Sequence, residues 1–238
     1  MRRISLLALA VTVLGAFLAT GGSAQGQGAT SDSGADSQER HWRVTISNLT
    51  PPGSGPPGSQ PLSPPLFVVH SNRADVWSVG EIASHVVAAI AEDANNAPAE
   101  SALVQLPGVT EVFTGEGGPI PSGESRTYLV TTQGRFNRLT ILTMLVNTND
   151  AFTGLDGLQL RGHERTRETN AYDAGSEVNN EQMEFIPGPC CGNPFVRDPE
   201  GELIRHHPGI EGVGDLDPDV YGWTDPVAMI VIERVANG

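Results

Sequence analysis

Oxygen-bearing side chains gather in two short segments of the chain. The first, NTNDAFTGLD at residues 147–156, follows a strongly apolar run, and the second is YDAGSEVNN at residues 172–180. Calcium prefers about six to eight oxygen ligands from carboxylates, amides, backbone carbonyls and water. The side chains of this kind that we single out are Asn149, Asp150, Asp156, Asp173 and Glu177.

The same residue types have a purely structural use. Asp and Asn accept hydrogen bonds from nearby backbone N–H groups, so they are common in turns and at helix caps. The residues alone leave both interpretations open. A calcium site becomes the better interpretation if the two segments are loops at one end of a β-sandwich, where loops cluster.

Two other patterns suggest metal binding but lack the residues or the geometry that a metal site needs. Asp215, Asp217 and Asp219 alternate as in an EF-hand loop, but its Gly position is Val220 and its final Glu position is Pro226. This stretch is therefore interpreted as an acidic turn. The neighbouring residues His206 and His207 point to opposite faces of an extended segment, so the pair is not expected to chelate one ion.

No local motif nominates a catalytic residue. The H-E-x-x-H, G-x-S-x-G and C-x-x-C patterns do not occur in the sequence. We therefore predict a non-enzymatic protein, with a secreted hydrolase built on a spatial triad as the remaining enzymatic alternative. Trp77 and Trp223 are candidates for a platform that stacks against sugars, and the alternative for each is packing in the core.

The charge of the chain excludes one class of partner. The net charge is −14 at pH 7, and every basic residue apart from histidine is Arg. Nucleic-acid binding requires a basic face, so we expect no nucleic-acid partner. The acidity fits cation binding, and it fits equally well solubility in a salty exterior.

The N-terminal residues predict the compartment. Residues 1–24 combine a basic start, an apolar run and small residues before a cut after Ala24, as in a signal peptide. A membrane anchor is the alternative, but the apolar run is short for a span. We expect a secreted protein, extracellular or periplasmic, with no stable membrane insertion after cleavage.

The elements that must position the two acidic segments are mostly strands. Residues 25–40 are small and polar and are predicted to be a disordered leader, so the ordered domain is 41–238. Trp42, Val44 and Ile46 alternate with polar residues, as in a half-buried strand. A β-rich run ends just before the first acidic segment, and a last strand closes the chain.

One helix stands out at residues 78–93, with Ser78 and Glu81 placed as a capping box. A second short helix is predicted at 97–106. Residues 161–226 lack periodicity and are expected to be mostly loops, where ligands should be sought. Together these elements predict an all-β fold, an antiparallel β-sandwich with one or two short helical insertions.

The only two cysteines, Cys190 and Cys191, are adjacent. Their Cα atoms should lie about 3.8 Å apart across a trans peptide, which is shorter than most disulfides prefer. A disulfide between the two, a pair of free thiols and an intermolecular bond all remain open. Neighbouring cysteines cannot close a long loop.

Several stretches carry a resemblance to a known family. They are VTISNLT at 44–50, PLSPPLFVVHSNRADVWSVGEIAS at 61–84, LTMLVNTNDAFTGLD at 142–156, AYDAGSEVN at 171–179 and the closing segment from His206. The chain resembles the spondin domain, the N-terminal module of F-spondin and mindin, over about residues 41–235. The resemblance implies a sandwich similar to calcium- and lipid-binding domains, with a calcium ion at one end.

The resemblance also implies ligands and a role. Asp150, Asp173 and Glu177 match its acidic calcium ligands, and Asn149 and Asp156 are further candidates. The implied function is a secreted, non-enzymatic calcium-binding module for adhesion or extracellular-matrix interaction. A glycan or surface-polymer binding module is the alternative, and the expected partner is an extracellular protein or glycan.

Overall fold

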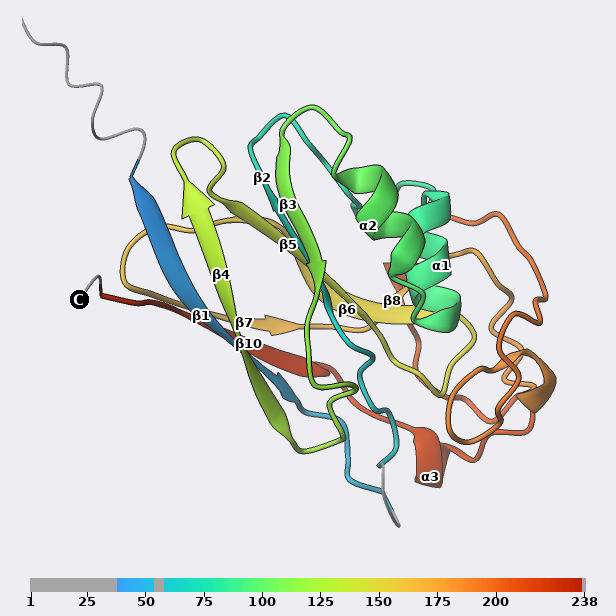
Figure 1. Ribbon diagram of the computed structural model, residues 1–238. Helices are drawn as coiled ribbons and strands as arrows, with labels where there is room; N and C mark the ends of the chain where they lie inside the picture. Colours follow the sequence, from blue (N-terminus) through green and yellow to red (C-terminus); the bar gives the residue numbers. More distant parts are fainter. Residues whose placement is uncertain (1–37, 54–57, 237–238) are drawn as a thin grey trace, which may run out of the picture. The chain divides into compact units, whose positions relative to one another are not determined.

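The strands form two antiparallel sheets in a computed structural model that describes residues 38–53 and 58–236 (Figure 1). The first sheet has the order β4-β1-β10-β7, and the second has the order β3-β2-β5-β6-β8-β9. The bounds of the first sheet's strands are β1 Glu39–Asn48, β4 Ser125–Gln133, β7 Glu164–Thr169 and β10 Ala228–Arg234. Those of the second are β2 Leu66–His70, β3 Val109–Thr114, β5 Arg138–Met144, β6 Ala151–Gln159, β8 Tyr172–Asp173 and β9 Arg205–His206.

The helices are short and lie outside the sheets. They are α1 His85–Asp93, α2 Ala97–Leu103, the 3-10 turn η1 Met183–Phe185 and α3 Pro218–Tyr221. The predicted all-β sandwich with short helical insertions is confirmed. The predicted signal peptide and most of the predicted leader lie outside the described residues.

The main core fills the space between the two sheets. Trp42, Val44 and Ile46 of β1 are buried and face Phe67 and Ile141 of the second sheet, as the alternation predicts. Strand β1 begins at Glu39, so the domain starts two residues before the predicted position, and the last two residues of the expected leader belong to the sheet.

A second core lies on the other face of the six-stranded sheet. Leu66 and Phe152 of the sheet pack with Val86 and Ile90 of α1, and α2 adds Leu103. Figure 1 shows α1 and α2 side by side over this sheet. Strands β2 and β5 are therefore buried on both faces, which explains their almost continuous apolar sequences.

The predicted start of the long helix is wrong. Helix α1 begins at His85, and the expected capping box at Ser78 and Glu81 does not form a cap. Gly80 has a φ of +89°, which an α-helix does not contain, and Ile82 forms a bridge with Leu203. The residues before α1 are therefore held as an extended segment by a distant part of the chain.

Residues 161–226 are mostly loops, as expected, but they include one regular strand that the sequence did not reveal. Strand β7 pairs with β10 over six residue pairs at the edge of the first sheet. Its sequence, ERTRET, is mostly exposed and lacks the alternation of polar and apolar residues that identifies a half-buried strand. The charged side chains suit an edge strand, which must avoid pairing with other chains.

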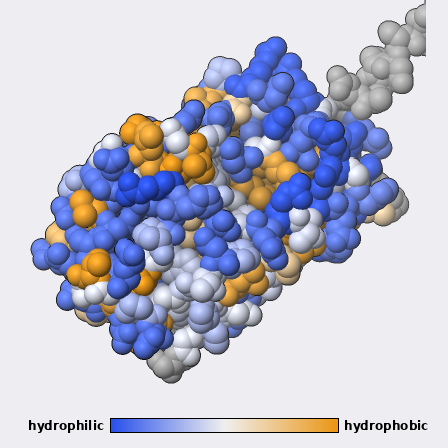
Figure 2. All heavy atoms as spheres, turned by 180° about the vertical axis from the view of Figure 1, so that it is seen from behind, coloured by the Kyte–Doolittle hydropathy of each residue, from blue (hydrophilic) through white to orange (hydrophobic). Residues whose placement is uncertain are grey.

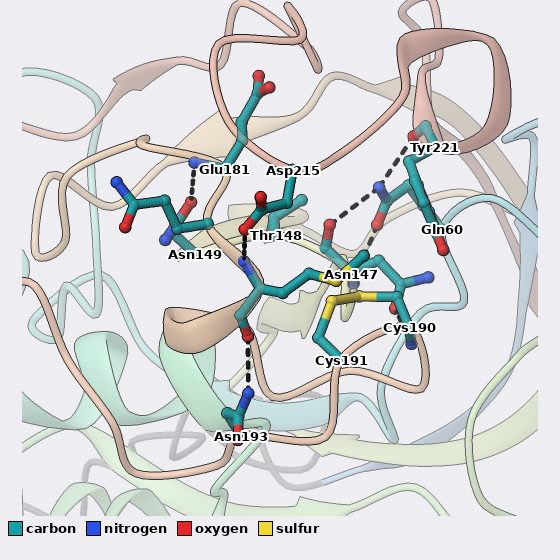
Figure 3. The surroundings of a disulfide bond; sticks show 12 residues. Gln60, Asn147, Thr148, Asn149, Glu181, Cys190, Cys191, Asn193, Asp215 and Tyr221 are labelled. Carbon is teal, nitrogen blue, oxygen red and sulfur yellow. Dashed lines mark hydrogen bonds between the residues drawn. A yellow bond between two sulfur atoms is a disulfide. The ribbon is translucent and has the colours of Figure 1, made fainter.

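Cys190 and Cys191 form a disulfide with each other, with an S–S distance of 2.00 Å and a Cα–Cα distance of 3.8 Å. This settles the alternatives that the sequence leaves open. The pair packs against a small third core of Ile186, Ile210 and Leu216. Figure 3 shows the disulfide beside Asn147, whose Oδ1 accepts a hydrogen bond of 3.1 Å from the backbone N–H of Cys190.

We expect the Cys190→Ser/Cys191→Ser double variant to lose only about 1 kcal/mol of unfolding free energy. A bond between neighbours removes little entropy from the unfolded chain, so mainly the packing against the third core is lost. Urea unfolding of the variant and of the wild type under oxidising conditions measures the difference. A loss several times larger would contradict this account of the bond.

The face shown in Figure 2 is largely hydrophilic. On the face shown in Figure 2, hydrophobic residues gather in separate patches between hydrophilic ones. Within the described part of the chain, no helix has the length and apolar character needed to cross a membrane.

Candidate metal centre

Asp150 lies at the end of the turn that joins β5 to β6. The Thr148 hydroxyl fixes this turn, because it donates to the Leu145 carbonyl at 2.6 Å and accepts from the Ala151 N–H at 3.0 Å. The side chain of Asp150 is fully buried. The turn after the apolar strand β5 thus places a carboxylate in the interior at one end of the sandwich.

The second acidic segment wraps around the Asp150 carboxylate. Oδ2 of Asp150 accepts hydrogen bonds from the backbone N–H groups of Ser176 at 2.8 Å and Glu177 at 3.0 Å. The Ser176 hydroxyl adds a third bond at 3.1 Å. Among the described residues, Oδ1 of Asp150 is buried without a hydrogen-bond partner.

Glu177 presents a second buried carboxylate in the same segment. Its Oε1 accepts a hydrogen bond of 3.2 Å from the Asp198 N–H and lies 3.8 Å from Nε of Arg197. Arg197 also pairs with Glu92 and the neighbouring Asp93 in α1, so one guanidinium serves three carboxylates. Within the described structure, Oε2 of Glu177 is buried and has no partner.

Negative charge in this region is poorly compensated. Burial raises the pKa of Asp150 to about 7, and the Asp173 charge adds to this, although hydrogen bonds from Glu177 and Ser176 oppose it. Burial raises the pKa of Glu177 to about 9, with further contributions from Glu92 and Asp150, while the bond from Asp198 opposes the shift. A bound cation would favour the charged form of both groups.

Asp173 differs from the other two because donors reach both of its oxygens. Oδ1 accepts from the Gly175 N–H at 2.7 Å. Oδ2 accepts from Nδ2 of Asn179 at 2.7 Å and from Nε of Arg205 at 2.9 Å, and Nη2 of Arg205 lies at the same distance. The protein itself therefore neutralises the charge of Asp173.

His207 acts on Asp173 through Asn179, a connection that no sequence pattern reveals. Nδ1 of His207 accepts from the Gly209 N–H at 3.0 Å, so Nε2 carries the hydrogen and donates to Oδ1 of Asn179 at 3.0 Å. Asn179 in turn donates to Asp173. Burial lowers the pKa of His207 to about 4, so the ring is neutral at pH 7. Its neighbour His206 is exposed on β9, as the expectation against chelation requires.

Asn149 lies next to Asp150 in the chain, but its side-chain oxygen already accepts a hydrogen bond. Oδ1 accepts a hydrogen bond of 3.2 Å from the Glu181 N–H, which Figure 3 shows, and Nδ2 donates to Asn180 at 3.2 Å. Asn149 therefore ties the two acidic segments together.

The structure does not bring Asp156 to this place. It lies on β6, six residues beyond Asp150. Given the length that each residue adds to a β-strand, the two residues are roughly 20 Å apart. There its Oδ2 accepts a hydrogen bond of 3.0 Å from the Ser78 hydroxyl. The prediction that Asp156 is a further ligand of the same ion is therefore wrong.

The sugar-stacking platform is wrong for Trp77. Its side chain is only 4% exposed and packs 4.9 Å from Phe152 and 5.0 Å from Tyr172, measured between ring centroids. Trp223 is half-buried in a different cluster, where its ring lies 5.2 Å from that of His207. The two indoles lie in different clusters and therefore do not form one platform.

The residues fit a calcium ion only in part. Asp150 and Glu177 each offer a buried oxygen without a donor, whereas Asp173 is engaged with Arg205. Among the described residues, no three His, Cys, Asp or Glu side chains form a group that could hold a metal ion by themselves. Amide oxygens, backbone carbonyls or water would have to complete the shell.

The comparisons with known proteins identify the family. A family model described as Spondin_N matches residues 47–180, more than half of the chain, and this range includes both acidic segments. A search of curated proteins finds no match. Spondin N-terminal domains are non-catalytic, extracellular modules of the adhesion type. This chain belongs to the spondin N-terminal domain family.

Proposed function

We propose that the protein is a secreted, non-enzymatic calcium-binding module that acts in adhesion at an extracellular surface. The observation that carries the proposal is the pair of buried carboxylate oxygens without donors, Oδ1 of Asp150 and Oε2 of Glu177. A buried polar atom without a partner is costly, so such a pair indicates a missing positive partner. The family supports the extracellular, adhesion-type role.

Asp150 and Glu177 would hold the ion. The two residues come from different segments that already contact each other through the N–H groups of Ser176 and Glu177. An ion between them would fix both segments at once. Asp173 would join as a third carboxylate ligand only if its carboxylate contacted the ion and Arg205 at the same time.

The expected partner is an extracellular protein or glycan. The net charge of −14 disfavours nucleic acid and anionic surfaces. An ion that fixes both acidic segments would also order the loops beside them, so partner binding at those loops should depend on calcium. Secretion through the N-terminal segment is part of the same proposal.

Thermal unfolding of residues 25–238 in chelator and across a calcium titration tests the proposal. We expect a saturable rise in Tm, equivalent to about 2.7 kcal/mol of unfolding free energy when calcium exceeds its Kd by about a hundredfold. Magnesium should have little effect because it demands a smaller, more regular shell.

Variants separate the candidate ligands from general charge effects. Asp150→Asn and Glu177→Gln should each abolish the calcium-dependent rise. Glu184→Gln is the matched control. Glu184 is exposed in η1, so its replacement removes the same charge away from the candidate site. A full calcium response in the Asp150→Asn variant would refute the site.

A further inference from the structure

A cavity of about 350 Å³ lies at the far end of β6 from Asp150. This volume falls in the range of small-molecule sites. Charged side chains of both signs line the cavity: Arg73, Asp75, Arg138 and Asp156. Asp156 does not belong to the candidate metal centre, so the cavity is a separate site.

A network of hydrogen bonds holds Arg138 in the basic wall of the cavity. Nη1 of Arg138 donates to the Gly157 carbonyl at 2.7 Å, and the Gly157 N–H donates to Oγ1 of Thr140 at 2.9 Å. Nδ1 of His70 lies 2.9 Å from the Ser71 carbonyl and must donate to it, so Nε2 accepts from the Thr140 hydroxyl at 2.8 Å. The position of Arg138 is thus fixed by the sheet.

In the acidic wall, the described residues supply one hydroxyl donor for two exposed carboxylates. The Ser78 hydroxyl lies 3.0 Å from Oδ2 of Asp156 and 3.4 Å from Oδ2 of Asp75. One hydroxyl hydrogen can serve only one of these carboxylates at a time. Burial raises the pKa of Asp156; the Ser78 hydrogen bond opposes this, and the charges of Asp75 and Glu81 add to it.

Opposite charges line this cavity without neutralising each other. Among the described residues, no ion pair within 4.0 Å joins either arginine to either aspartate. Arg73 makes no side-chain hydrogen bond within the described part of the chain, and Arg138 uses only Nη1. Charged ends of both signs therefore remain available to a ligand.

We infer that this cavity binds a small zwitterion, a molecule with one carboxylate and one ammonium group. The guanidinium groups of Arg73 and Arg138 suit a carboxylate, which they can contact through paired N–H donors. Asp75 and Asp156 suit an ammonium group, which supplies the donors that the acidic wall lacks. Free amino acids are the simplest ligands of this class.

A sugar fits the cavity less well. Within the described residues, the lining contains no Trp, Tyr or Phe on which a sugar ring could stack. The balance of two positive and two negative side chains also favours a ligand with both charges over a neutral one.

Isothermal titration of residues 25–238 with a series of probes tests the inference. Glycine, 4-aminobutyrate and 6-aminohexanoate carry both charges at increasing separation, whereas propionate and ethylammonium each carry one. We expect saturable binding of at least one zwitterion, about tenfold or more tighter than either single-charge probe. Arg138→Gln and Asp156→Asn should each weaken it by about tenfold or more.

Two control variants on the other sheet remove the same charges. Arg167→Gln and Glu168→Gln in β7 should leave probe binding unchanged. The calcium-dependent rise in Tm should persist in Arg138→Gln and Asp156→Asn, which also shows that these variants are folded. Failure of this inference can therefore be distinguished from failure of the calcium proposal.

Three results would overturn the inference. The first is that no zwitterion binds saturably. The second is that propionate or ethylammonium binds as tightly as the best zwitterion, which would indicate a simple ion site. The third is that glucose binds and is lost in the same two variants while zwitterions do not bind, which would indicate a sugar site.

Discussion

Replacing Gly175 with alanine is expected to lower the unfolding free energy by about 3 kcal/mol or more. Gly175 has a φ of +66°, in the left-handed region that side chains disfavour. A Cβ atom at this position would also lie 2.4 Å from the carbonyl oxygen of Glu202, which is a backbone atom. The two penalties add because rotating the backbone of Gly175 to relieve one would break the turn.

The same substitution should weaken the calcium binding that we propose. The N–H of Gly175 donates to Asp173, and the next two N–H groups donate to Asp150. If the turn moves, the acidic segment no longer wraps around Asp150. The calcium-dependent rise in Tm should therefore shrink in the Gly175→Ala variant, in addition to the loss of stability in chelator.

Gly201→Ala is the matched control. A Cβ atom at Gly201 would meet nothing within 4 Å. We expect this variant to stay within about 0.5 kcal/mol of the wild type. Urea unfolding of both variants measures the difference, and equal stability of the two would show that the Gly175 turn is not constrained.

In chelator, the unfolding free energy should fall as the pH rises from about 6.5 to about 9. The pKa values of Asp150 and Glu177 are raised from 3.8 and 4.5 to about 7 and about 9. Over this window the folded chain keeps protons that the unfolded chain has released. Stability is therefore lost with increasing pH, by about 1 kcal/mol per pH unit for each group that stays protonated.

His207 has the opposite effect at lower pH. Its pKa is lowered from 6.5 to about 4, so between these values only the unfolded chain binds the proton, and stability rises with pH. This partly cancels the effect of the carboxylates below pH 6.5. The clearest fall should therefore begin above pH 6.5.

Urea unfolding at several pH values between 6.5 and 9, with and without calcium, measures this dependence. Calcium binding requires the deprotonated carboxylates, so its Kd should decrease as the pH rises. The Asp150→Asn/Glu177→Gln double variant should show a flatter pH dependence in chelator. A slope unchanged in this variant would mean that other groups cause the fall.

The fold was predictable where the sequence has a clear period. Trp42, Val44 and Ile46 reveal β1 because one face of that strand is buried and the other is exposed. Strand β7 could not be found in this way because it lies at an edge and its side chains are mostly exposed. The start of α1 depends on the bridge between Ile82 and Leu203, which are far apart in the sequence.

The candidate site was predictable in its residue types but not in its pairing. Asp150 and Glu177 stand out as acidic residues in loops after strands, and the structure brings them together. The partner of Asp173 is Arg205, 32 residues away, and only the pairing of β8 with β9 places it there. Spacing along the chain likewise could not show that β6 carries Asp156 away.

The arrangement of β1 and β10 determines how the module responds to mechanical load. These strands are antiparallel neighbours, and Trp42 lies opposite Arg234, so both leave the sheet at the same end. Tension between those two ends would open the ladder one pair of bonds at a time, which resists force poorly. The second acidic segment, residues 172–180, follows the other end of this sheet, where Ala228 pairs with Thr169. Tension between one terminus and a partner held there would run along the strands and load their hydrogen bonds together, in shear.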